Sequence, residues 1–209
     1  MESQFTPQTR PLFFTKARVL VVASSLIWPC AMSAQQLQID THKSVMTIHV
    51  GKSGVFSGFA HNHEIAAPIT SGNVNISNPP SVELRVDARQ LRVRDPDASE
   101  KDRNEIQKTM LGPGVLDTER HQEIAYKSDV VEAAGAGHWT VRGKLTLKGQ
   151  ARPVTVDVIE KAGHYTGHAT LKQTDFGIKL VKVAGGTVTV KDEVRVEFDI
   201  QIARELATP

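Results

Sequence analysis

The fold of this chain is decided by the stretch WTVRGKLTLKGQARPVTVDV at residues 139–158. Its apolar residues occupy alternate positions on both sides of a turn sequence: Trp139, Val141, Leu145, Leu147, Val154, Val156 and Val158. Successive side chains of a β-strand point to opposite faces, so this period of two is typical of a strand with one buried face. Lys148 and Gly149 supply the turn, with Pro153 beyond it. The stretch therefore predicts a β-hairpin.

The same alternation continues along most of the chain. The longest run stays in phase from the turn at residues 185–186 almost to the carboxyl terminus: Val188, Val190, Val194, Val196, Phe198, Ile200 and Ile202. Further strands are expected near residues 45–50, 73–76, 82–86, 123–131 and 165–172. About eight strands with short turns and no βαβ spacing favour an all-β antiparallel barrel or sandwich.

One segment departs from the alternation. Asp97, with Glu100 three residues later, resembles the start of a helix with a capping arrangement. Ile106 and Met110 follow at helical spacing, and a Gly-Pro-Gly sequence comes directly afterwards. Residues 97–111 therefore predict one short helix, whose apolar face could cover one mouth of a barrel.

The first 34 residues have the order of a secretory signal peptide. Basic residues precede an apolar run at residues 19–28, and small residues follow up to Ala34. That run is about half of the roughly 20 apolar residues that a membrane-spanning helix needs. We expect residues 1–34 to be removed on export and residues 35–209 to form a single domain.

Loss of the leader changes what chemistry the chain can carry. Cys30, the only cysteine, lies in the leader, so the mature chain would have neither a disulfide nor a thiolate nucleophile. The mature chain would also have equal numbers of acidic and basic residues. A formal net charge of zero gives no broad basic field, so no nucleic-acid partner is expected.

Sequence motifs for catalysis are scarce. Asp175, Phe176 and Gly177 match the metal-binding triplet of protein kinases, but the glycine-rich loop and the catalytic loop are missing. The sequence also has no Gly-x-Ser-x-Gly elbow, no His-Glu-x-x-His helix and no glycine-rich dinucleotide loop after a strand. We therefore expect a binding protein, with no catalytic residues, rather than an enzyme.

His61 and His63 are the most chemically suggestive pair. Alternate residues of a strand share a face, so two imidazoles could chelate one cation, with Glu64, His42 or His49 as a third ligand. A tight metal site needs three or four convergent ligands, and the spacing ensures only two. A structural or pocket-lining pair near a barrel mouth is therefore the main interpretation. A metal- or redox-linked periplasmic module is the alternative.

Several short motifs occur in a characteristic order along nearly the whole mature chain. They are IDTHKS at 39–44, GVFSGF at 54–59, VDA at 86–88, ML at 110–111, the stretch at 116–124, VRGKLTLKG at 141–149, RPV at 152–154, TDFGI at 174–178 and KDEV at 191–194. In this combination the chain resembles the YceI-like proteins, a bacterial polyisoprenoid-binding family. The resemblance implies a single lipocalin-like barrel, which we expect to have eight strands, export to the periplasm and a long isoprenoid chain in the interior.

The resemblance and the strand phase together give a set of candidate ligand-binding residues. A barrel of about eight strands can either fill its interior with side chains or leave room for one ligand. The candidates are Phe56, Phe59, His61, His63, Leu84, Ile106, Met110, Leu116, Tyr126, Trp139, Val141 and Phe176. The expected partner is an apolar small molecule or lipid, with no resident cofactor or metal. Whether the chain forms a homodimer is left open.

Overall fold

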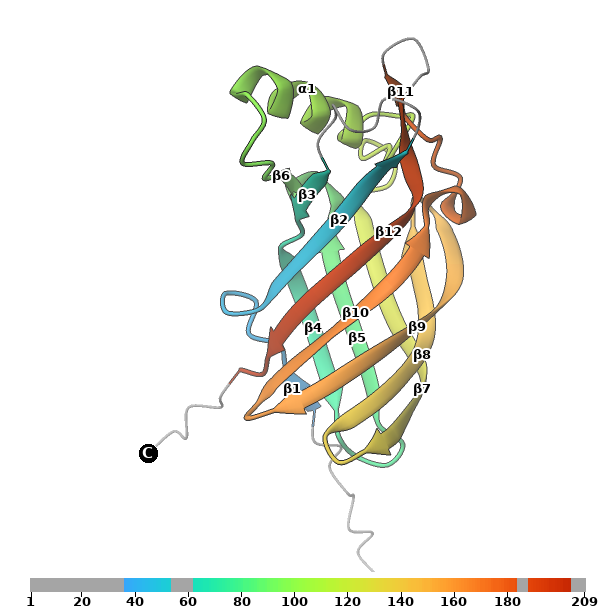
Figure 1. Ribbon diagram of the computed structural model, residues 1–209. Coiled ribbons are helices and arrows are strands. Elements are labelled where there is room, and N and C mark those ends of the chain that lie inside the picture. Colours follow the sequence, from blue (N-terminus) through green and yellow to red (C-terminus); the bar gives the residue numbers. More distant parts are fainter. Residues whose placement is uncertain (1–35, 54–61, 184–187, 204–209) are drawn as a thin grey trace, which may run out of the picture. The chain divides into compact units, whose positions relative to one another are not determined.

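Most of the residues that the structure describes belong to one antiparallel sheet (Figure 1). The computed structural model describes residues 36–53, 62–183 and 188–203. The strands in these ranges are β1 (Gln36–Gln38), β2 (Val45–Ser53), β3 (His63–Ala66), β4 (Ile69–Asn75), β5 (Ser81–Asp87), β6 (Arg92–Val93), β7 (Glu123–Gly135), β8 (His138–Leu147), β9 (Gln150–Lys161), β10 (His164–Lys172), β11 (Lys182–Val183) and β12 (Val188–Gln201). The predicted signal peptide, Phe56, Phe59 and His61 lie outside the described residues.

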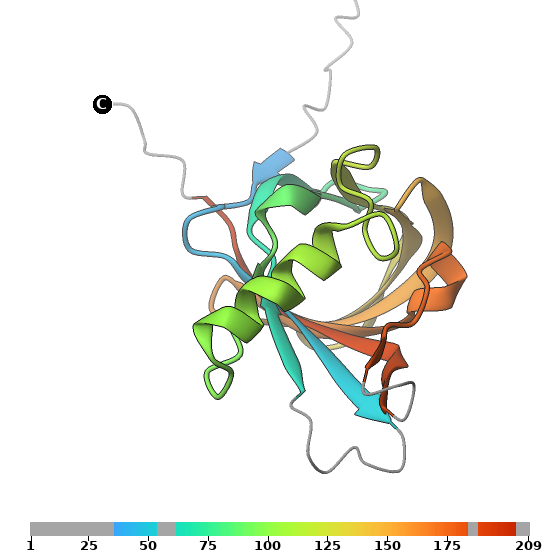
Figure 2. The same ribbon diagram turned by 90° about the horizontal axis from the view of Figure 1, so that it is seen from above.

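The sheet curls around an interior (Figure 2). Neighbouring strands follow the order β1-β4-β5-β7-β8-β9-β10-β12-β2-β3-β6, and β11 pairs with β12. Residues that follow β1 also bond to the end of β12. Ile39 forms a bridge with Ile202, and the Asp40 N–H donates to the carbonyl of Gln201 over 2.8 Å. These bonds connect the segment after β1 to β12, although the two strands are not neighbours in the strand order. They make the sheet barrel-like.

The predicted all-β antiparallel class is confirmed, but the predicted number of eight strands is not. The described residues form twelve strands. Eight of them have seven residues or more, and the other four have only two to four. Alternation becomes recognisable over roughly four to eight residues, so segments as short as β1, β3, β6 and β11 give almost no signal in the sequence.

The hairpin predicted from residues 139–158 is present as β8 and β9. Trp139 lies opposite Val158, and Val141 lies opposite Val156, so these apolar side chains share the inner face. Lys148 and Gly149 form the turn, and their φ angles are 49° and 70°. Two positive φ angles in a two-residue loop give the twist that suits a tight hairpin, and glycine adopts such an angle without strain.

The one α-helix of the described residues lies over one end of the curled sheet (Figure 2). It runs over α1 (Glu100–Leu111), so it begins three residues later than predicted. The cap is Ser99 instead of Asp97, because the Ser99 side chain accepts a hydrogen bond from the Asp102 N–H. No helix among the described residues has both the length and the apolar character needed to cross a membrane.

Two short 3₁₀ helices complete the described structure, η2 (Ala88–Gln90) and η3 (Gln173–Phe176). The triplet that matches the kinase motif forms the end of η3. Phe176 is buried there, and Gly177 ends the helix in the left-handed conformation with φ of 69°. The triplet therefore serves as a turn that directs an aromatic ring inward.

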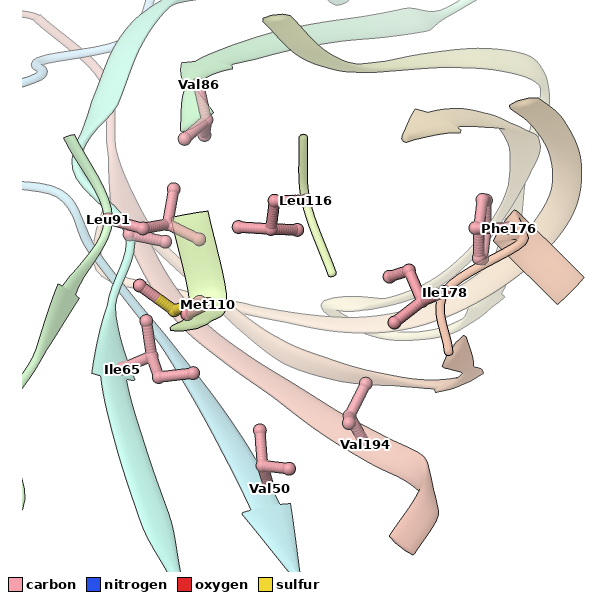
Figure 3. Close-up of a cluster of buried hydrophobic side chains, with 10 residues drawn as sticks. Val50, Ile65, Val86, Leu91, Met110, Leu116, Phe176, Ile178 and Val194 are labelled. Carbon is pink, nitrogen blue, oxygen red and sulfur yellow. The ribbon is translucent and has the colours of Figure 1, made fainter. Parts of the chain in front are cut away.

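The largest hydrophobic core cluster lies beneath α1 (Figure 3). Its buried members come from β2, β3, β5 and β12, from the segment after β3, from the last turn of α1 and the loop after it, from the residue after η2, and from η3 and the loop after it. They are Val50, Ile65, Ala67, Val86, Leu91, Met110, Leu116, Phe176, Ile178 and Val194. We call this group the helix-end cluster. It lies at the end of the curled sheet that α1 covers.

Candidate ligand-binding cavity

A cavity of about 480 Å³ occupies the interior of the curled sheet. The inner faces of β2, β4, β5, β7, β8, β9, β10 and β12 enclose it, and most of the lining side chains are Val, Ile and Leu. Its polar lining residues are few: Asn75, Ser81, Glu160, Gln173 and the aromatic residues Tyr126, Tyr165 and Trp139. Among the described lining residues Glu160 alone carries a charge. The interior thus offers apolar contact with few directional groups.

The two ends of the cavity differ. At the helix end the lining is tightly buried, as shown by Phe176, whose exposed fraction is 2%. At the opposite end, which we call the turn end, the lining comes from residues beside the β4–β5 and β9–β10 turns, including Asn75, Ser81 and Glu160. Ile76, in the same turn region, also lines the cavity and is 50% exposed. The described lining is therefore mainly apolar at the helix end, where Gln173 is a polar member, and more polar and more exposed at the turn end.

Seven predicted ligand-binding residues line this cavity. They are Leu84, Met110, Leu116, Tyr126, Trp139, Val141 and Phe176. Ile106 is not among the lining residues, although it lies one turn before Met110 on α1. Only the last turn of the helix and the loop after it contribute, through Met110, Val115 and Leu116. That these side chains contact a ligand remains a prediction.

His63 lies on β3, near the helix end, and is not among the residues lining the cavity. Its Nδ1 is 2.6 Å from Oδ2 of Asp95, a carboxylate with an exposed fraction of 2%. The other oxygen of Asp95 accepts a hydrogen bond from the Glu64 N–H over 2.7 Å. Asp95 therefore ties β3 to the segment that leads into α1. This arrangement gives His63 a structural partner.

The described residues contain no group of three or more His, Cys, Asp or Glu side chains placed to hold a metal ion. His49, a predicted third ligand, lies 3.3 Å from Glu197 in a partly exposed pair. The metal hypothesis also depends on His61, which lies outside the described residues. It stays an untested prediction.

Two tyrosines place phenol groups in the apolar interior. The Tyr126 hydroxyl donates a hydrogen bond to the carbonyl of Val141, 3.2 Å away. Burial raises the pKa of Tyr126 from 10.0 to about 12, and the charge of Asp129 adds to the rise. Burial and then the charge of Glu160 also raise the pKa of Tyr165. Because burial penalises the phenolate, both rings favour the neutral form.

This shift predicts how stability depends on alkaline pH. Below about pH 10 the phenol of Tyr126 is protonated in the folded and unfolded chains, and its contribution is fully present. As the pH rises from 10 toward about 12, the Tyr126 phenol ionises in the unfolded chain but stays protonated in the folded chain. The free energy of unfolding therefore falls. The variant Tyr126→Phe should show a shallower fall, measured by urea unfolding across this range. If the free energy of unfolding falls equally steeply with pH in Tyr126→Phe and in the parent protein, the burial of this phenol would be contradicted.

Sequence reasoning missed several lining residues that alternate in phase with predicted ones. Phe198 and Ile200 belong to the long carboxyl-terminal run, and Tyr165 lies on β10 opposite Glu160. The alternation of apolar residues along this strand was enough to predict Phe198 and Ile200 as lining residues. Glu160 gives no such signal, since an acidic residue near a turn is normally assigned to the surface.

A curled antiparallel sheet around an apolar interior, with one helix at its end, defines a lipocalin-like all-β protein. The sequence model of the YceI-like domain matches residues 37–202, and the chain therefore belongs to the YceI-like family. The predicted family is confirmed.

Relatives agree with this assignment, and one solved structure has a similar fold. A UPF0312 protein of Shewanella oneidensis is 26% identical over 179 residues, covering 77% of this chain and 85% of the relative. A UPF0312 protein of Vibrio cholerae is 27% identical over 192 residues, covering 84% and 93%. The crystal structure of Burkholderia cenocepacia BcnA superimposes with a TM-score of 0.62 at 21% identity, covering 79% of this chain and 99% of BcnA. This last likeness shows the shared fold.

Proposed function

We propose that this chain is an exported binding protein that holds one long apolar molecule, a polyisoprenoid or another lipid-like compound, inside its curled sheet. The observation that carries the proposal is the cavity of about 480 Å³ with a lining composed mainly of Val, Ile and Leu. Its volume falls in the range of roughly 300–1,000 Å³ typical of small-molecule sites. The function is binding without catalysis, and its place is the periplasm after removal of residues 1–34.

The length of the cavity favours a chain over a compact metabolite. Trp139 and Leu147 stand eight positions apart on β8, and both line the cavity. At the rise of a β-strand, this separation corresponds to about 26 Å along β8. A flexible hydrocarbon could fill such a space. Each Å² of apolar surface withdrawn from water would contribute roughly 25 cal/mol before the ordering costs are subtracted.

The proposed contacts are the seven predicted residues that line the cavity, from Met110 and Phe176 at the helix end to Trp139 at the turn end. The alternative, a metal- or redox-linked module, depends on His61 and on a second role for His63, which already bonds Asp95.

Organic extraction of the protein purified from its own host tests this proposal. Mass spectrometry of the extract should find a long-chain apolar compound in an amount close to that of the protein. An unrelated exported protein, purified and extracted in parallel, controls for lipid that copurifies with any protein. Extracts that match this control would contradict the proposal.

A further inference from the structure

The curled sheet is split between β9 and β10. The two strands pair from His164 opposite Lys161 to His168 opposite Asp157. Over the remaining described residues β9 still pairs with β8, and β10 with β12, but β9 and β10 do not pair with each other. The split lies toward the helix end, where β10 leads into η3 and β9 begins after the β8–β9 turn.

Pro153 gives a reason in the sequence for this split. The Glu160 N–H donates to the carbonyl of Gly137 over 2.7 Å, on the β8 side of the strand. Successive residues of an antiparallel strand direct their backbone groups to opposite sides, so Asp157, Thr155 and Pro153 direct theirs toward β10. Proline has no N–H to donate, and in sheets it is found at unpaired edges. A continued ladder between β9 and β10 would therefore lack a donor at Pro153.

A cleft of about 310 Å³ occupies the split. Its lining includes exposed residues of the outer surface, such as Pro153 and Thr170. It also includes Val154, Leu171 and Phe176, which line the interior cavity as well. Among the described residues these three alone border both spaces. Three apolar side chains therefore separate the outer cleft from the interior.

Phe176, the largest of the three, is carried by the short helix η3, which polar contacts hold against β12. The Asp192 carboxylate accepts hydrogen bonds from the Thr174 N–H over 2.9 Å and from the Thr174 hydroxyl over 2.7 Å. The Gln173 amide donates to the carbonyl of Lys191 over 2.7 Å. All three bonds lie at the exposed surface. Water can replace each partner there, so η3 can separate from β12 at a modest cost in free energy.

We propose that η3 is a side gate, through which the apolar molecule enters and leaves the interior between β9 and β10. When η3 separates from β12, Phe176 leaves its place between the cleft and the cavity. The two strands need not break any bond of their ladder, since they already part beyond Asp157 and His168. Entry at the turn end would instead bring the molecule past the charged Glu160, whose desolvation is costly. This inference rests on the proposed function and adds the route of the ligand.

A disulfide between η3 and β12 tests the gate. The side chains of Thr174 and Asp192 are in contact, so Thr174→Cys with Asp192→Cys brings two thiols close together. Adding Cys30→Ser leaves these as the only cysteines of the full chain. Stopped-flow fluorescence of the delipidated protein with the apolar dye N-phenyl-1-naphthylamine measures kon, koff and Kd. The oxidised form should bind and release the dye at least about tenfold more slowly than the reduced form. Kd should stay the same, because a gate changes the path and not the two end states.

Two single variants complete the test. Asp192→Ala removes both hydrogen bonds to Thr174, so kon and koff should both rise about threefold with Kd unchanged. Asp199→Ala is the matched control. It makes the same change on the same strand, at a partly exposed carboxylate that lies 2.9 Å from His164 and away from η3. Both rates in Asp199→Ala should equal those of the parent protein.

Equal rates in the oxidised and reduced forms would overturn the gate and leave the proposed function intact. A change in Kd without a matched change in both rates would do the same. If the disulfide does not form, Asp192→Ala decides, and rates equal to those of the parent would overturn the gate. A parent protein that does not bind the dye at all would contradict the proposed function, and the gate with it.

Discussion

Replacing Ala169 by tryptophan is expected to lower the affinity for the bound apolar molecule by roughly 5- to 150-fold. Ala169 lies on β10 opposite Val196, and both side chains line the cavity. An indole at position 169 would project into the space proposed for the ligand. Excess volume in a packed interior costs roughly 1–3 kcal/mol, and each 1.4 kcal/mol is about tenfold in affinity. Quantitative extraction and titration with hexadecane both measure the loss.

The neighbouring position supplies the matched control. Thr170 follows Ala169 on β10 but is exposed and lies opposite Arg195, so its side chain faces outward. The variant Thr170→Trp should retain the ligand as the parent protein does. Equal retention in Ala169→Trp and Thr170→Trp would show that the ligand does not occupy the cavity.

Replacing Phe176 by alanine is expected to lower the free energy of unfolding by about 3–5 kcal/mol. The ring is 2% exposed and belongs to the helix-end cluster. Removing it would take away buried contacts and enlarge the cavity that the protein already contains, and the surrounding strands could collapse only partly. Urea unfolding of the delipidated protein measures the effect without a contribution from ligand binding.

Two further variants serve as comparisons for Phe176→Ala. Phe176→Leu keeps most of the buried volume and should lose much less stability. Val130→Ala truncates a side chain that is 43% exposed and should change the free energy of unfolding by less than about 0.5 kcal/mol. A loss below about 1 kcal/mol in Phe176→Ala would contradict the closed packing at the helix end.

The sequence predicted those parts of the fold in which a physical pattern repeats. The hairpin of β8 and β9 follows from alternation over 20 residues and from a turn whose residues accept positive φ. The predicted start of α1 was wrong by three residues, because Asp97 and Ser99 are both good caps. Only the structure shows that Ser99 accepts the hydrogen bond from the Asp102 N–H. Short strands such as β6, with two residues, depend on pairing partners distant in the sequence.

The candidate site divides in a similar way. Residues such as Leu84 and Val141 could be assigned to the interior because strand phase decides which face a side chain occupies. Helical spacing could not show that Met110 reaches the cavity while Ile106 does not, because this depends on how α1 lies over the sheet. The split between β9 and β10 was also beyond sequence reasoning, since the point where two strands part is a property of the folded sheet.

The curled sheet is proposed to hold one apolar molecule in its cavity. Native mass spectrometry of the intact protein, isolated without detergent or added lipid, tests this most directly. We expect a folded species heavier than the denatured chain by the mass of one long-chain molecule. This increment should be lost in Ala169→Trp and retained in Thr170→Trp. A folded protein with the mass of the bare chain, unchanged after incubation with hexadecane, would contradict the proposal.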